Sequence, residues 1–224
     1  MKYILLFIAC FAMYWNLQAQ QETNFELPKW QVGLDVLPYF DTSSSIKNSI
    51  LIRKVINEST SLRSNLGIAF ENINNRPNDK PETSLNQGSE LNSYLSVGLE
   101  HYLFRKRVSV YFGGEVFGSY YRILKHNEVD TRPDANPPTI FKIDDLYQTF
   151  KLGMNGLSGF SLAVAKNFNV NVEAKLILAY QWEQGDYKQY EGPDYTLTVF
   201  GGRTIKRTLA KLIPLSGIYL VYDF

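Results

Sequence analysis

The sequence predicts an all-β fold, an eight-stranded antiparallel up-and-down transmembrane β-barrel with short periplasmic turns and long extracellular loops. Three observations predict it. Apolar and polar residues alternate with period 2, which places them on opposite faces of a strand. Most alternating segments have nine or more residues, whereas globular strands average about five or six and tilted membrane strands need about 9–11. Short and long connections alternate, as in outer-membrane barrels.

The composition fits this class of protein. The chain has 224 residues, a formal net charge of +1 and 14% aromatic residues, among them 15 tyrosines and 14 phenylalanines. Aromatic enrichment is typical of strands and of membrane-interface belts. A near-neutral charge provides no basic footprint for nucleic acid, so we expect no nucleic-acid partner.

The first twenty residues, "MKYILLFIACFAMYWNLQAQ", predict a secretory signal peptide. Lys2 supplies a positive n-region, and residues 4–13 form an apolar h-region that is too short to span a bilayer as a helix. We expect removal of residues 1–20 by cleavage near Ala19 or Gln20.

The remaining residues, 21–224, are predicted to form one outer-membrane barrel domain. Cys10, the only cysteine, lies in the signal segment, so the mature domain can contain no disulfide. The stretch "FIAC" allows an alternative interpretation as a lipoprotein box, although the apolar run before it is short. After residue 20 no apolar run approaches the roughly 18 residues of a helical span.

Eight strand candidates follow from the alternation. Three connections are short ("NESTS", "RKR", "KNFN"), and three are long and polar, ending with "EQGDYKQYEGPDYTLTVFGGRTIKRTLAK". An even strand count places both termini at the short-turn end. The "GLSG" stretch within the sixth candidate predicts a bulge or kink. The candidates are residues 30–39, 49–57, 62–73, 91–103, 108–121, 147–165, 170–182 and 214–224.

The composition of the two faces separates a membrane barrel from a soluble one. In 170–182, apolar residues such as Leu176 and Leu178 alternate with Asn171, Glu173 and Lys175. A soluble barrel with an apolar interior would show the same alternation. The polar face, however, contains repeated mid-strand glycine, which a narrow lumen needs and a solvated face does not. We therefore expect the apolar face to contact lipid.

The polar face carries nearly balanced charges. We expect a paired, hydrogen-bonded network that fills the lumen, because buried ions require partners. The functional alternative is an ion path or a carboxylate pair for acid–base work. Arg53 is a further candidate, since the facing of the second strand stays open. The predicted lumen residues are Asp35, Arg63, Glu71, Glu100, Glu115, Lys151, Glu173 and Lys175.

The two histidines of the chain do not indicate a catalytic or metal-binding site. His126 lies near Glu128 and Asp130, but no spacing there is diagnostic of catalysis, and an exposed loop position is the simpler interpretation. His101 lies near a short turn. We predict no enzyme, no catalytic residue, no cofactor and no metal site, since cysteine and histidine ligands are too few for zinc.

The last long connection is rich in tyrosine and ends with basic residues. Its aromatic residues are expected to pack on the barrel rim or, alternatively, to form a binding patch. The basic residues are candidates for contact with lipopolysaccharide phosphates. They are Lys206, Arg207 and Lys211.

The chain ends in "IYLVYDF", with Ile218, Leu220, Tyr222 and Phe224 on one face of the last strand. Together with the signal segment and the strand pattern, this end resembles small eight-stranded outer-membrane β-barrel proteins of Gram-negative, Bacteroidetes-type bacteria. The stretch "GMNGLSGFSLAVAKNFNVNVEAKLILAY" is similar to a hairpin of such barrels. The resemblance implies that these four residues form a C-terminal signal read by the outer-membrane assembly machinery.

The resemblance implies location in the cell outer membrane and contact with its lipid, with lipopolysaccharide and with periplasmic chaperones. It carries no specific activity, because fold does not fix function. We expect a structural or surface-interaction protein whose long loops contact lipopolysaccharide or an unknown extracellular partner. The alternatives are a narrow, porin-like pore for small solutes and a lipid-modifying or proteolytic barrel enzyme.

Overall fold

The protein is an all-β molecule. A computed structural model describes residues 29–39, 49–75, 85–132, 139–192 and 196–224, so the predicted signal peptide and Cys10 lie outside the described residues. Among the described residues, no helix is long and apolar enough to cross a membrane. The elements are β1 (Trp30–Asp35), the 3-10 helix η1 (Leu37–Tyr39), β2 (Ser49–Val55), β3 (Thr60–Asn75), β4 (Leu85–Phe104), β5 (Val108–Arg132), β6 (Thr139–Ala165), β7 (Phe168–Glu191) and β8 (Thr196–Asp223).

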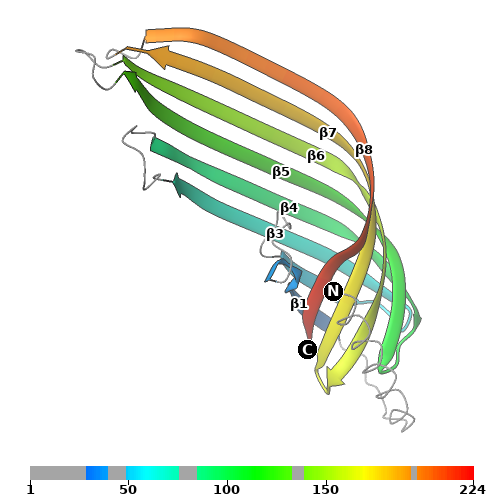
Figure 1. The fold of residues 1–224 in the computed structure, drawn as a ribbon. Coiled ribbons are helices and arrows are strands. Elements are labelled where there is room, and N and C mark those ends of the chain that lie inside the picture. The colour runs from blue at the N-terminus through cyan, green and yellow to red at the C-terminus, as the bar shows by residue number, and fades with distance from the viewer. Residues whose placement is uncertain (1–28, 40–48, 76–84, 133–138, 193–195) are drawn as a thin grey trace.

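Eight antiparallel strands follow one another in a ring-like sheet (Figure 1). Each strand pairs with its sequence neighbour, and the end of β8 returns to β1, where Gln31–Asp35 pair with Tyr219–Asp223. The final residue is part of this seam, since the Phe224 amide donates to the Trp30 carbonyl at 2.9 Å. The ordered, aromatic end of the sequence is therefore tied to the first strand.

The three short connections are confirmed. They span residues 56–59, 105–107 and 166–167. In the first, the Ile56 amide donates to the Thr60 carbonyl at 3.0 Å, and Asn57 Oδ1 accepts from the Ser59 amide at 3.0 Å. Asn and Ser therefore satisfy the backbone locally, as such residues do in tight turns.

The predicted long loops are largely wrong. β5 extends to Arg132 and β6 begins at Thr139, while β8 begins at Thr196 rather than near residue 214. These largely polar segments have weak intrinsic strand propensity, but in the structure they form the arms of continuous hairpins. Cross-strand hydrogen bonds and side-chain pairing override that propensity, because strand preference depends strongly on context.

β1 and β2 are shorter than predicted. β1 ends at Asp35, where Oδ1 accepts from the Leu37 amide at 3.0 Å and begins η1. β2 has seven residues, whereas β3 to β8 have 16 to 28. The longer strands therefore run on beyond the ring as an open, curved sheet (Figure 1). We call this part the projecting sheet and define it as residues 85–92, 121–132, 139–149, 183–191 and 196–206.

The bulge predicted at "GLSG" is wrong. Residues 156–159 of β6 pair in unbroken register with β5 and with β7. Gly159 serves close packing instead, because a Cβ there would lie 2.7 Å from the Tyr111 ring. The register shifts lie at Ala163/Ala165 of β6, against β7, and at Glu173/Lys175 and Gln189/Tyr190 of β7, against β8.

Candidate functional site

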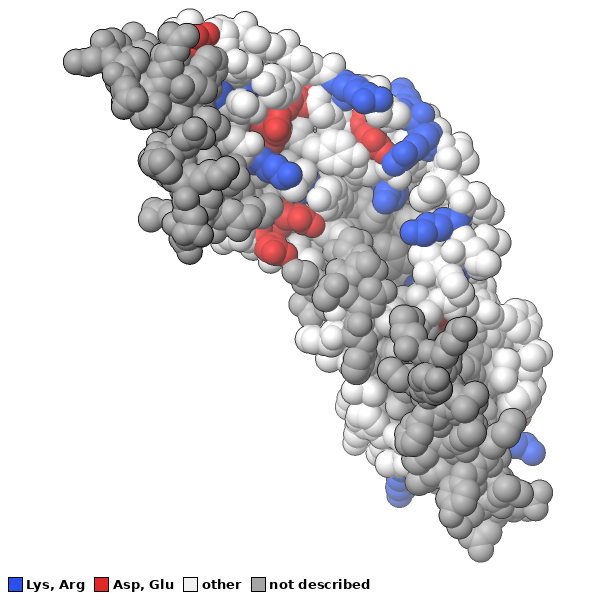
Figure 2. Space-filling model, viewed as in Figure 1, with Lys and Arg blue, Asp and Glu red and all other residues white. Residues whose placement is uncertain are grey.

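The ring is polar inside and apolar outside. On β7, Glu173 and Lys175 are buried, whereas Leu176 and Leu178 are 46% and 51% exposed. A water-soluble protein buries its large apolar side chains and exposes its charges. Figure 2 shows charged side chains mainly over the projecting sheet, with few visible around the ring. The two faces of the ring are therefore inverted relative to a soluble domain.

Two arginines and three carboxylates form the centre of the interior. Arg53 Nη2 donates to Glu100 at 2.9 Å and to Glu173 at 3.0 Å. Arg63 Nη1 donates to Glu100 at 2.6 Å, and Arg63 Nη2 donates to Glu173 at 3.1 Å. Arg63 Nε also lies 3.2 Å from Glu115. Ion pairs buried this completely require such multiple partners, because the desolvation cost of each charge is large.

Glu115 joins this centre to a second layer. Lys175 Nζ lies 3.2 Å from Glu115. The same carboxylate accepts hydrogen bonds from Asn155 at 2.7 Å, Tyr94 at 2.9 Å and Ser96 at 3.0 Å. We call the whole group the ion network. Its three cations and three carboxylates sum to zero charge, and they are Arg53, Arg63, Lys175, Glu100, Glu115 and Glu173.

Tyrosines complete the ion network. Tyr111 donates to Glu173 at 2.8 Å, and Tyr102 donates to Glu100 at 3.1 Å. Tyr219 accepts from Asn65 at 2.9 Å. The Tyr111 ring packs against Gly159 and the Tyr219 ring packs against Gly217, each in space that a Cβ would need.

The short-turn end of the ring is also filled. Arg105 stacks 3.8 Å from the centre of the Tyr102 ring and donates to Ser61 at 2.6 Å. Burial in the turn lowers the pKa of the Arg105 guanidinium. The cavity lined by Gln31, Tyr102, Arg105 and Asn169 has a volume of about 20 Å³, which is room for roughly one water molecule.

The predicted lumen residues separate into two groups. Five of them lie in the ion network together with Arg53, and they are Arg63, Glu100, Glu115, Glu173 and Lys175. Three others lie outside the ion network. These are Asp35, which accepts from Ser49 at 3.3 Å, Glu71, which is exposed on β3, and Lys151, which is half-buried on β6.

The lumen network predicted from the sequence names none of the tyrosines, although alternation places them on its face. Tyr102 shares its strand face with Glu100, and Tyr219 shares its face with Asp223. The period-2 alternation that selected the charges therefore also places these rings inward. The carboxylates were selected because they are charged, whereas Tyr is expected on either face of a membrane strand.

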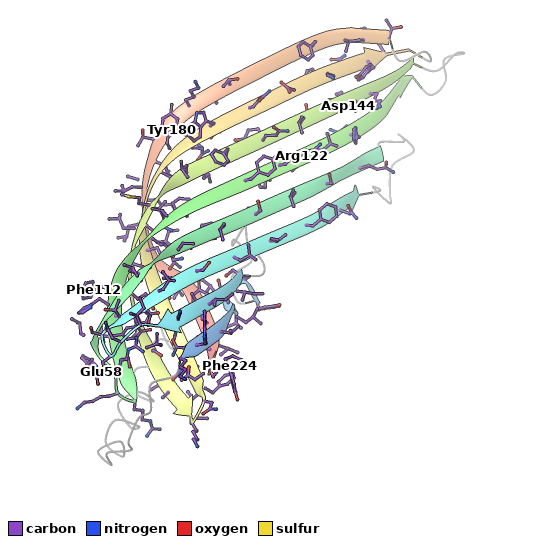
Figure 3. The ribbon with its side chains drawn as sticks, turned by 180° about the vertical axis from the view of Figure 1, so that it is seen from behind. Glu58, Phe112, Arg122, Asp144, Tyr180 and Phe224 are labelled. Atoms are coloured by element: carbon purple, nitrogen blue, oxygen red, sulfur yellow. The ribbon has the colours of Figure 1, made fainter. Side chains whose placement is uncertain are left out.

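The projecting sheet contains His126. His126 Nδ1 lies 2.7 Å from Asp144 Oδ1 on the neighbouring strand β6, and Lys142 lies 3.7 Å from the other oxygen. Figure 3 places Arg122 and Asp144 on this sheet, far from Phe112 and Phe224 at the ring. The side chains of Glu128 and Asp130 lie outside the described residues. No group of three His, Cys, Asp or Glu residues suited to a metal is found in the described part of the chain.

The C-terminal residues line the outside of the seam. Leu220, Tyr222 and Phe224 are exposed, and Ile218 is half-buried. The rings of Tyr222 and Phe224 meet edge to face with centroids 4.8 Å apart.

Comparisons of the chain with protein-family models, with curated proteins and with solved structures find no match. The function is therefore inferred from the geometry of the ring, the ion network and the projecting sheet.

Proposed function

We propose that the chain is an outer-membrane β-barrel protein of structural or surface-interaction type, with a filled polar lumen. The observation that carries this proposal is the inverted polarity of the ring, whose six buried ionic groups lie inside a wall of exposed Leu, Ile, Val and Phe. Hydrocarbon accepts such a wall, and in hydrocarbon a sheet must pair its edges. The pairing of β8 with β1 meets this requirement over Tyr219–Asp223.

Aromatic residues lie at the upper and lower ends of the apolar wall. Phe150, Tyr180 and Trp182 lie in ring contact at one level, with centroids 5.5 and 4.4 Å apart. Phe168 lies at the other level, beside Tyr222 in the β7–β8 ladder. From Phe168 to Tyr180, a strand rising about 3.3 Å per residue and tilted about 45° climbs roughly 28 Å. This height suits a bilayer core with aromatic girdles.

Beyond the upper girdle the outward face becomes polar. Gln148, Leu146 and Asp144 follow Phe150 on β6, and Gln184 and Asp186 follow Trp182 on β7. The projecting sheet would then stand outside the cell as a large surface for an external partner. A filled lumen argues against a porin-like pore.

Conductance provides one test. The refolded protein should give no stable conductance in planar bilayers at neutral pH, because the ion network and the tyrosines fill the ring. A general porin added to the same bilayer serves as the positive control. Reproducible openings of one unit size that change with Glu115→Gln would show that the lumen conducts.

Deleting Phe224 tests the cellular part of the proposal. In cells, the deletion should strongly reduce the amount of heat-modifiable protein in the outer-membrane fraction, because the terminal aromatic residue belongs to the expected assembly signal. In vitro, refolding into detergent should suffer only modestly, because the deletion removes the single pair of hydrogen bonds with Lys29 and Trp30. Normal assembly in cells would count against the outer-membrane assignment.

A further inference from the structure

The inner face of β6, β7 and β8 carries a group of basic residues just beyond the ion network. Lys151 pairs across the sheet with Gln181, which in turn pairs with Arg207. Lys211 lies four residues further along β8 and pairs with Ile177. Gln181 and Ile177 face the same side of β7 as Lys175, because they lie six and two residues from it. The residues that pair with them therefore also face the inside of the sheet. We call Lys151, Arg207 and Lys211 the basic group.

The basic group has an excess of positive charge. Glu183 lies 2.5 Å from Arg207 and also accepts from Gln181, so this carboxylate is already engaged. Lys151 lies in the field of the positive charges of Arg207 and Lys211 and of the negative charge of Glu183. Within the described residues, neither Lys151 nor Lys211 lies in an ion pair. Three cations against one carboxylate leave a net charge of +2. Figure 2 shows Lys and Arg side chains gathered where β7 and β8 bend.

The basic group lies beside a strand edge. In the described part of the chain, residues 196–217 of β8 pair with β7 alone, and the ladder with β1 begins at Tyr219. Lys151 and Arg207 are also at the level of the upper girdle, since both pair with Gln181, the residue between Tyr180 and Trp182, whereas Lys211 lies four residues below Arg207. Also below Arg207 on β8, Leu212 and Leu215 are exposed. Cations at the girdle level and apolar residues beneath them match the two ends of an amphiphile.

We propose that the basic group binds the phosphate-bearing head group of an anionic membrane lipid, which reaches it around the edge of β8 while the acyl chains lie against Leu212 and Leu215. This inference rests on the proposed membrane location. Lys151 and Lys211 supply ammonium groups that form no ion pair among the described residues. Arg207, held by Glu183, keeps its remaining guanidinium donors available for phosphate oxygens.

Spin-labelled lipids test the proposal directly. The full mature chain is refolded into phosphatidylcholine vesicles that contain a trace of spin-labelled phosphatidic acid or spin-labelled phosphatidylcholine. Electron paramagnetic resonance then measures how strongly each label is immobilised at the protein. We expect a preference for phosphatidic acid that falls roughly tenfold in Lys151→Gln/Lys211→Gln, from the attraction of basic residues to anionic lipid. This variant leaves the Arg207–Glu183 pair intact.

A matched variant removes the same charge elsewhere. Lys125→Gln/Lys188→Gln alters two exposed residues of the projecting sheet and should keep the preference for phosphatidic acid. An equal loss in both variants, or no loss in Lys151→Gln/Lys211→Gln, overturns the site. Displacement of the label by excess inorganic phosphate would assign a soluble ligand instead and also overturn the proposal. Insertion is checked in the same samples by heat-modifiability, and failure there overturns the membrane location itself.

Discussion

Replacing Glu173 by glutamine should lower the free energy of unfolding by about 3–5 kcal/mol, the usual cost of breaking a buried ion pair. Glu173 accepts hydrogen bonds from Arg53, Arg63 and Tyr111 at 2.8 to 3.1 Å, and its side chain is fully buried. Glutamine keeps the shape but removes the charge that both guanidinium groups face. Chemical denaturation of the protein refolded into lipid vesicles, followed by tryptophan fluorescence, measures the loss.

Two further variants define what the loss means. Glu58→Gln alters a carboxylate in the exposed turn 56–59, and should change stability by less than about 0.5 kcal/mol, as surface substitutions do. Combining Glu173→Gln with Arg63→Met should recover part of the lost free energy of unfolding. The double variant keeps equal numbers of cations and carboxylates in the ion network, whereas Glu173→Gln alone leaves one cation without a partner. If Glu173→Gln is as mild as Glu58→Gln, the ion network does not hold the ring together.

Leu176→Arg should destabilise the protein by about 2–4 kcal/mol, which is the cost of arginine on the lipid face of a barrel at the bilayer midplane. Leu176 is exposed on β7 and lies between the two girdles, eight residues from Phe168. In a water-soluble sheet the same exposed position would accept arginine at little cost. Denaturant titration in vesicles measures the difference in unfolding free energy.

The same strand offers the control. Gln184 is exposed, faces the same side as Leu176 and lies beyond Trp182, where the wall becomes polar. Gln184→Arg should therefore cost about 0–1 kcal/mol, the value near the membrane interface. A larger loss of unfolding free energy for Leu176→Arg than for Gln184→Arg supports the membrane position of the ring. Equal and small costs at both positions would refute it.

Some features could be predicted from sequence because they depend on local rules. The facing of β7 follows from strict period-2 alternation, so Glu173 and Lys175 were placed inward and Leu176 outward. The three short turns follow from Asn, Ser, Lys and Arg between alternating segments. The expectation that the inward charges would be partnered follows from the cost of burying an ion. The membrane location, the C-terminal signal and the functional class stay predictions.

Other features depended on contacts between distant segments. The sequence alone determined the all-β class, the eight strands and the identity of the inward face, because neighbouring residues encode alternation. Only the tertiary structure decided that Lys151 lies outside the ion network, that tyrosines complete it, and that the predicted long loops are the arms of a projecting sheet. Each of these depends on register and on how far two strands stay paired. Pairing energy comes from hydrogen bonds and side-chain contacts across strands, which no single segment carries in its own composition.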